Sequence, residues 1–455
     1  MKLERLDWRV VLALATVSML LQQAFSYVCQ LAMPFLADRL AEEFEISRAW
    51  LGVYLSLQNI AAICAALGCG ALIVKVGALR ISQWCLLCMG ASLFVTATGA
   101  LWLYPLGAIL LGAASVSTPA SSHILARFCP PRLAPLVFSI KQTGVPVGSL
   151  IAGVLIPALL GLGITVAFLD LHVELDAFAT AFVVGLIVYA MAALLEPLRS
   201  HFDSDRKPDT GINLAGVLRT MRYVVQTPEL RDLSMVAFAL GGLQSVWAGF
   251  FILFVIDGLD RSEIEAGTMF ATASLTAIGA RILWGWLGTA LVSPRRILAA
   301  LCAIATAAAL LTALYQPDWA AWLILGVAIL YNVTSLSWHG VLLAETARLA
   351  PAGMVGGVTG GVLAFTSVAM MLYPAFYGGL LALTGSYGVG FAAAVLPALF
   401  IAFVLALPPR QGSWFDLIAW PGLVRLRRPR AAAFGTILLA AAALLALFAL
   451  LSTQS

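Results

Sequence analysis

Twelve long apolar stretches dominate this chain of 455 residues and restrict it to folds that form in a lipid bilayer. A helix that crosses a hydrocarbon core of about 30 Å needs about 20 predominantly apolar residues. Stretches of suitable length lie at residues 10–35, 49–73, 81–103, 105–126, 136–160, 177–198, 232–256, 265–289, 296–315, 319–344, 355–382 and 386–407. Each is continuously apolar rather than alternating, which predicts helices and not the strands of a barrel. We therefore expect an all-α polytopic membrane protein with twelve transmembrane helices.

The overall composition supports this class and excludes several others. Apolar residues make up 62% of the chain and charged residues 11%, whereas soluble globular proteins average about 45–50% and about 25%. This composition excludes a soluble enzyme, a disordered chain and a nucleic-acid-binding domain. The net charge of +4 is also too small to indicate a polyanionic partner.

The lysine and arginine residues are divided very unequally between the two sides of the predicted bundle. With the N-terminus placed in the cytoplasm, 21 of the 26 basic residues lie in inner segments, three lie in outer loops and two lie within the spans. Short cytoplasmic loops of membrane proteins carry an excess of lysine and arginine. We therefore expect a multi-pass protein of the cell (inner) membrane with a cytoplasmic N-terminus.

The spans divide into two groups of six that flank a polar segment. We expect an N-terminal six-helix bundle at 1–198, a cytoplasmic central loop at 199–231 and a C-terminal six-helix bundle at 232–408. In the tail at 409–455, tryptophans and a run of arginines precede the uncharged stretch 431–451. The first part of this tail is typical of a segment that contacts anionic membrane lipids, and the second is long enough for a thirteenth helix.

Short sequence matches recur between the two groups of spans. Ala126–Pro130 at the end of the fourth span resembles Ala347–Pro351 at the end of the tenth, 221 residues later. A glycine followed ten residues later by an arginine comes after both the second and the eighth span. These matches predict two parallel six-helix pseudo-repeats, an arrangement typical of secondary transporters that rock one half against the other.

The loops after the second and eighth spans carry a resemblance to a known family. Residues 70–80 resemble the short glycine–basic signature of the major facilitator superfamily, and residues 285–296 resemble its second copy. The resemblance implies the fold of that family over residues 8–408, and gating roles for Gly70, Lys75, Gly77, Arg80, Gly285 and Arg295. The family often carries an aspartate where Val74 and Thr289 stand, and this chain lacks both. The stretches 138–148 and 338–345 are similar to a bacterial branch of the same family.

Two basic residues, Lys141 in the fifth span and Arg281 in the eighth, lie within predicted membrane helices. A charge there costs at least about 2.5–3.5 kcal/mol on insertion scales, so each is a candidate functional residue. No acidic residue is placed firmly in the membrane interior, and an anionic ligand would compensate both cations. The alternatives are that Arg281 pairs with a nearby carbonyl or loop acid, and that Lys141 extends its side chain toward the inner surface.

Uncharged polar side chains near the middle of several spans indicate where a binding cavity would lie. Gln23 and Tyr27 are four residues apart on one face of the first span, and Asn332 shares a face of the tenth with His339. Polar side chains of this kind avoid lipid, so they either line a cavity or contact another helix. The substrate-binding candidates are Gln23, Tyr27, Asn59, Lys141, Gln142, Gln244, Trp247, Arg281, Asn332 and Trp338.

The sequence also bears on the source of energy for transport. It contains no nucleotide-binding P-loop and no motif for a metal or another cofactor, so transport would use an ion gradient or run passively. His339 is the first candidate for proton coupling and His123 the second, because the unperturbed pKa of histidine, about 6.5, lies in the working range.

Three classes of function compete for such a chain. We expect a secondary transporter that takes up a small organic anion together with protons. Proton-driven efflux of drugs or metabolites is the alternative within transport. A membrane enzyme or a sensor would need a catalytic cluster or a large soluble domain, and the sequence shows neither.

Overall fold

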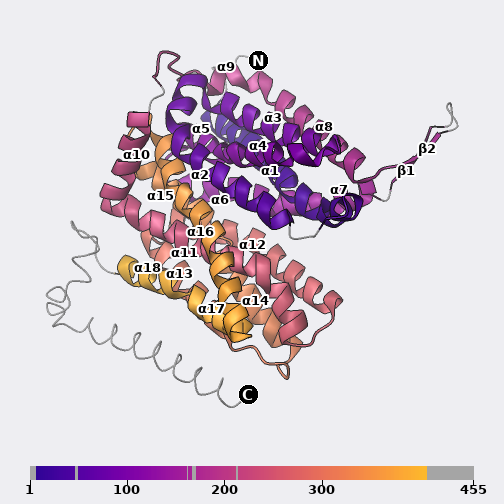
Figure 1. Ribbon diagram of the computed structural model, residues 1–455. Coiled ribbons are helices and arrows are strands. Elements are labelled where there is room, and N and C mark those ends of the chain that lie inside the picture. The colour runs from indigo at the N-terminus through magenta and orange to yellow at the C-terminus, as the bar shows by residue number, and fades with distance from the viewer. Residues whose placement is uncertain (1–6, 47–49, 161, 167–170, 212–213, 407–455) are drawn as a thin grey trace, which may run out of the picture. The chain divides into compact units, whose positions relative to one another are not determined.

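The computed structural model describes residues 7–46, 50–160, 162–166, 171–211 and 214–406. In this part of the chain, twelve helical spans are long and apolar enough to cross a membrane, which confirms the predicted fold class. In Figure 1 the helices of the first half are coloured from indigo to magenta, and those of the second half continue through orange to yellow. The predicted interfacial tail and thirteenth helix, at 409–455, lie outside the described residues.

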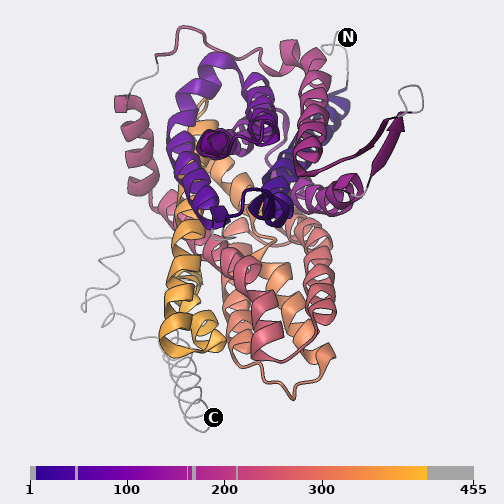
Figure 2. The same cartoon turned by 45° about the vertical axis from the view of Figure 1, so that its right-hand side comes forward.

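The first half of the chain contributes six spans, three of which are single helices. Its helices are α1 (Trp8–Glu43), α2 (Trp50–Val76), α3 (Ala78–Ala97), α4 (Tyr104–Ala113), α5 (Ser117–Phe128), α6 (Ala134–Gln142), α7 (Gly144–Leu160), α8 (Ala177–Leu194) and the short α9 (Arg199–Phe202). Between α7 and α8, the strands β1 (Gly163–Val166) and β2 (Leu171–Glu174) pair as an antiparallel hairpin, which Figure 2 shows extending from the helices. The sequence patterns did not predict this hairpin.

The second half contributes the other six spans after one connecting helix. The connecting helix is α10 (Leu214–Gln226), and the spans are built from α11 (Pro228–Leu253), α12 (Glu263–Ala290), α13 (Pro294–Ala313), α14 (Ala321–Ser335), α15 (His339–Leu349), α16 (Val355–Thr384), α17 (Tyr387–Ala394) and α18 (Leu396–Ala406). A π-helical turn at Phe254–Gly258 prolongs α11.

Several helices begin where the sequence supplies a residue suited to a helix N-terminus. The carboxylates of Asp7 and Asp176 accept backbone N–H groups at the starts of α1 and α8, and the hydroxyl of Ser262 does so for α12. Pro228 and Pro294 occupy the first position of α11 and α13, where proline loses no hydrogen bond. These residues are local signals for the helix starts in the sequence itself.

The internal duplication is visible in the interruptions of two spans. The fourth span is interrupted by a 3₁₀ turn at Ala114–Val116, and the tenth is interrupted between α14 and α15. The helices that follow, α5 and α15, end at Phe128 and Leu349, which are 221 residues apart. This spacing is the one at which the sequence matches recur, so the fourth and tenth spans end at corresponding positions.

The two halves meet most extensively along four helix pairs: α2 with α16, α6 with α12, α6 with α15, and α5 with α16. We call the end of the bundle with the α2–α3 turn and the segments 129–133, 291–293 and 350–354 the basic end, because most of the described loop arginines and lysines lie there. Helix α10 lies beside α2, α11 and α16 at this end (Figure 1). The contacts between halves that are described below also lie toward the basic end.

Candidate functional site

Lys141 is one of the most completely buried polar residues of the described chain. It is the penultimate residue of α6, and only 1% of its surface is exposed. Its Nζ donates to Oε1 of Gln23 on α1 at 2.6 Å, and Thr118 on α5 donates to the same oxygen at 3.2 Å. Within the described residues no carboxylate forms an ion pair with Lys141. Lys141 therefore does not extend toward the basic end, and an amide oxygen holds its charge in the interior.

Arg281 on α12 is also buried, with 2% of its surface exposed, but it is satisfied by backbone carbonyls. Its Nε and one terminal nitrogen donate to the carbonyl of Leu336, at 3.0 and 2.8 Å, where α14 ends. Its other terminal nitrogen donates to the carbonyl of Gln142, where α6 ends. The alternative interpretation of Arg281, pairing with a nearby carbonyl, is thus the arrangement that the structure contains.

The carbonyl of Gln142 is available because of Pro146. In a continuous helix the N–H of the residue four positions later would donate to it, and proline has no N–H. Helix C-termini also carry partial negative charge, which favours a nearby cation. The guanidinium of Arg281 therefore lies against two such termini, one from each half of the protein.

His339, Trp338 and Tyr27 lie close to these cations. The ring of His339 stacks on that of Trp338, with centroids 3.8 Å apart, and the buried Nδ1 of His339 has no hydrogen-bond partner in the described chain. His339 is within electrostatic range of both Lys141 and Arg281, and Tyr27 is within range of Arg281. We call Lys141, Arg281 and His339 the cationic cluster.

A further candidate, Trp247, lies in an aromatic group within the second half. The ring of Trp247 stacks against Phe251 and Tyr331, at centroid distances of 3.8 and 4.9 Å, and the Tyr331 hydroxyl donates to a carbonyl of α11 at 2.8 Å. The indole nitrogen of Trp247 is buried without a partner among the described residues, as are the side-chain oxygens of two other candidates, Gln244 and Asn332. This group has the character of a packed core with an unsatisfied indole nitrogen.

The described hydrogen bonds of two predicted site residues, Asn59 and His123, do not involve the cationic cluster. Asn59 donates to the carbonyl of Leu55 in its own helix, whereas the neighbouring Gln58 has the buried and unsatisfied oxygen. His123 pairs with a carboxylate that follows α9. Conversely, the patterns did not single out Thr118, although it stands in a serine- and threonine-rich part of the fourth span. Among the described residues, His, Cys, Asp and Glu form no group of three or more that could bind a metal.

At the basic end, α6 packs closely against α12 and α15 through two glycines. A methyl group at Gly285 would lie 2.5 Å from Cβ of Ser139 and 2.8 Å from the Pro135 carbonyl oxygen, and one at Gly340 would overlap the backbone of Ser139. The backbone N–H at Leu136 in the first turn of α6 donates to the Thr289 hydroxyl of the other half, at 3.2 Å. Thr289 occupies the position where the superfamily often carries aspartate, and it caps a helix of the opposite half.

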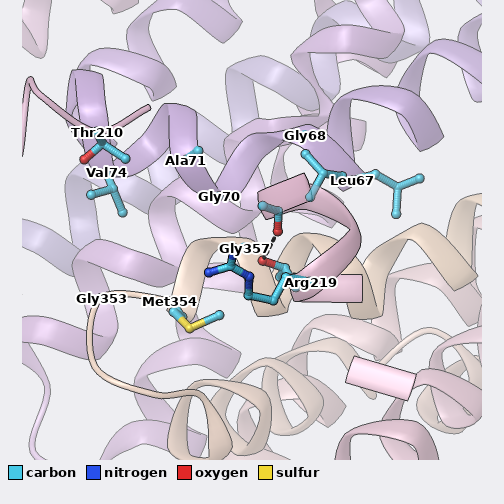
Figure 3. Close-up of a pocket in the computed structure, with 13 residues that line it drawn as sticks. Leu67, Gly68, Gly70, Ala71, Val74, Thr210, Arg219, Gly353, Met354 and Gly357 are labelled. Atoms are coloured by element: carbon cyan, nitrogen blue, oxygen red, sulfur yellow. Dashed lines mark hydrogen bonds between the residues drawn. The ribbon is translucent and has the colours of Figure 1, made fainter. Parts of the chain in front are cut away.

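A second close contact joins α2 to α16. A methyl group at Gly70 would lie 2.6 Å from the Cα of Gly357, and the thiol of Cys69 lies 3.5 Å from the carbonyl oxygen of Gly356. Beside this contact is a pocket of about 250 Å³, which Val74 helps to line (Figure 3). The full lining is Leu67, Gly68, Gly70, Ala71, Val74, Thr210, Gly216, Val217, Arg219, Thr220, Gly353, Met354 and Gly357.

The basic residues of the two predicted gating loops differ in their contacts. Arg80 forms an ion pair with Glu196 at 3.1 Å, and Arg295 forms one with the largely buried Asp232 at 2.9 Å. Each pair lies within one half of the protein. Lys75 is exposed. The two arginines therefore stabilise their own bundles, while Gly70, Gly285 and Thr289 contact the other half.

Two aspartates after α9 attach the central segment to the first half. Asp203 accepts two backbone N–H groups of the first turn of α3, and burial raises its pKa; Gly77, with a φ of 108°, leaves no room for a side chain beside it. Asp205 accepts from Arg127 at 2.7 Å and lies 2.8 Å from Nε2 of His123. Burial opposes ionisation of Asp205, but its interactions with His123 and Arg127 outweigh it and lower its pKa.

The chain is similar to one protein family and to several solved structures. Residues 12–361 match the model of the Major Facilitator Superfamily. The Escherichia coli fucose:proton symporter is 15% identical with a TM-score of 0.68, over 89% of this chain and 100% of that one. The human organic anion transporter MFSD10 is 16% identical with a TM-score of 0.67, over 88% and 100%. A bacterial homologue of the iron transporter ferroportin, in its outward-facing state, is 16% identical with a TM-score of 0.68, over 86% and 98%.

At these identities, similarity to solved structures shows the fold alone. No curated protein matches the chain in sequence.

Proposed function

The chain belongs to the Major Facilitator Superfamily, and from that premise we propose that it is a secondary active transporter that takes up a small organic anion together with protons. Alternating access of the two six-helix halves would move the solute across the membrane. The family match and the twelve membrane-competent spans support transport rather than catalysis.

The observation that supports an anionic substrate is the state of Lys141. Its ammonium group is buried in the membrane-spanning part of the bundle, and its only partner in the described chain is the neutral amide of Gln23. A buried charge is costly unless an opposite charge compensates it. A carboxylate bound beside Gln23 and Thr118 would supply that charge and accept the remaining ammonium hydrogens. The name of the human structural neighbour, an organic anion transporter, agrees with this substrate class.

Proton coupling is proposed for His339. Its Nδ1 is unpartnered in the described chain and its ring lies near both cations of the cluster, so protonation of His339 adds a third positive charge to the same region. An anion and a proton would then bind cooperatively, because each reduces the electrostatic cost of the other. One structural neighbour is named a fucose:proton symporter.

The orientation follows from the positions of the basic residues. We place the basic end in the cytoplasm of a bacterial cell and the protein in the inner membrane, because loops rich in lysine and arginine are retained on the inner side. The conformation with a closed basic end is then outward-facing, like the state in which the ferroportin homologue was solved. Anionic lipids of the inner leaflet would contact the basic loops and the tail.

Counterflow in proteoliposomes tests the anion proposal. Vesicles with purified protein and an internal pool of lactate, benzoate or succinate should accumulate the same radiolabelled anion from outside. Lys141→Ala should abolish this exchange, because it removes the cation that would bind the carboxylate. The protein should still fold, because the substitution removes a charge whose burial is costly. Lys207→Ala, which removes an exposed lysine of the central segment, should leave exchange intact. Unchanged exchange by Lys141→Ala would overturn the anion proposal, and expulsion of lipophilic cations instead would favour efflux.

A second measurement addresses the proton. His339→Gln should retain counterflow, which needs no proton gradient, and should lose the accumulation that an imposed inward proton gradient drives. Gradient-driven accumulation that survives this substitution would exclude His339 as the coupling residue.

A further inference from the structure

Arg281 is the one member of the cationic cluster whose described hydrogen bonds connect the two halves. Lys141 and its partner Gln23 both belong to the first half. Arg281 belongs to the second half, as does Leu336, but the carbonyl of Gln142 belongs to the first. Two buried cations that look equivalent in the sequence therefore differ in a way that matters for movement between the halves.

The position of this bond along the helices is equally informative. On α12, Arg281 lies one turn before Gly285, and on α6, Gln142 lies one turn after Ser139. The bond between Arg281 and Gln142 therefore lies about one helical turn farther from the basic end than the layer in which Gly285 and Gly340 pack against Ser139. Opening the basic end must separate α6 from α12 and α15, and this separation breaks the bond.

The chemistry of the bond suits a contact that is repeatedly made and broken. When α6 moves away, Arg281 keeps both donors to Leu336, so its charge stays partly compensated at the C-terminus of α14. The carbonyl of Gln142, which cannot bond to Pro146, loses its described partner and becomes accessible to water. The bond therefore stabilises the closed basic end specifically, without being needed to hold either half together.

We propose that Arg281 is the latch of the basic end: its bond to the backbone carbonyl of Gln142 holds the two halves together there and must break in every transport cycle. The proposal rests on the alternating access that is proposed above, because only a protein that opens this end needs such a latch. Arg281 in this role positions the halves and does not contact the substrate.

Cys69 provides a built-in reporter of the basic end that does not depend on Arg281. The residue is 1% exposed, and its thiol lies at the contact between α2 and α16, against the carbonyl of Gly356 of the other half. The contact with Arg281 is made by other helices, α6 and α12. A protein that keeps Cys69 and has serine at the other six cysteines should react slowly with maleimide while the basic end is closed. The positions to replace are Cys29, Cys64, Cys85, Cys88, Cys129 and Cys302.

The rate of maleimide labelling in nanodiscs, without any substrate, gives the test. Arg281→Gln should raise the rate at Cys69 by about tenfold, the factor that corresponds to about 1.4 kcal/mol, and Arg281→Lys should give an intermediate rate, because lysine can donate to one carbonyl but lacks the planar fork. Lys141→Gln is the matched control: it removes a buried cation of the same cluster whose described bond lies within one half, so the rate should not change.

Each outcome decides the proposal. A rate for Arg281→Gln equal to that of the parent overturns it, and so does an equal rise for Lys141→Gln, which would make the effect a general consequence of removing a cation. Where Arg281→Gln fails to fold, as judged by gel filtration and thermal unfolding, the Arg281→Lys rate decides alone, and an unchanged rate counts against the latch. Because labelling needs no substrate, it can fail while anion counterflow succeeds, or the reverse.

Discussion

Replacing Gly340 with alanine tests whether the halves separate as rigid bodies at the basic end. Gly340 is the second residue of α15, and a methyl group there would overlap the backbone nitrogen and Cα of Ser139 on α6. A rotation of the serine side chain cannot relieve an overlap with backbone atoms. The helices must therefore move apart in the closed conformation, whereas an open basic end has room for the methyl group.

The size of the effect follows from this overlap. Inserting a methyl group into a well-packed contact costs typically about 1–3 kcal/mol. If the cost applies only to the closed conformation, the ratio of open to closed protein rises by about 5- to 150-fold. The helix itself is not weakened, because alanine has a higher helix propensity than glycine.

The assay is again the maleimide reactivity of Cys69, which lies at the other contact between the halves. Gly340→Ala should increase the rate at which maleimide labels Cys69, although this cysteine lies on α2 and the substitution affects the contact between α6 and α15. Gly326→Ala on α14 is the matched control, because a methyl group there would meet no atom within 4 Å. A folded Gly340→Ala protein with the parent rate would refute the reasoning, since it would show that one contact can loosen while the other stays closed.

Two further predictions concern the basic end and the segment beside it. Val74→Asp should slow the labelling of Cys69 by about two- to fivefold, because a carboxylate in the pocket would face the N-terminus of α16; a faster rate would contradict this. Asp205→Asn should speed tryptic cleavage after Arg206, because it weakens the bonds to the histidine and arginine of α5, and unchanged cleavage would indicate that Asp203 alone holds the segment.

The fold could be predicted from the sequence because the signals for its helices are local and repeated. Twelve apolar stretches and the unequal division of basic residues predict the spans, and the family match supports the same fold. Even the match between Ala126–Pro130 and Ala347–Pro351 marks corresponding helix ends in the structure. The β1–β2 hairpin was not predicted, because four-residue strands next to long apolar helices leave little pattern.

Only part of the site could be predicted from the sequence, because a count of charged residues does not show which of them donate to backbone carbonyls. Lys141 and Gln23 were both candidates, and the structure joins them. Arg281 was grouped with Lys141 as an uncompensated charge, but the carbonyls at two helix ends compensate it. Pro146 was the available signal, since a proline frees the carbonyl four residues earlier. The pairing of His123 with Asp205 depends on how the central segment folds back, which short motifs do not encode.

This difference between the two cations leads to a prediction about substrate charge. With Arg281 held by carbonyls, Lys141 is the cation of the described site that lacks a strong acceptor. While His339 is uncharged, a single carboxylate balances the site, and a second would be buried without a partner, at a cost of several kcal/mol. Counterflow should therefore be faster with butyrate than with succinate, which has the same number of carbons and one more carboxylate. Faster exchange of succinate would mean that Arg281 leaves the Gln142 carbonyl to bind substrate, and the latch and the binding site would then share one residue.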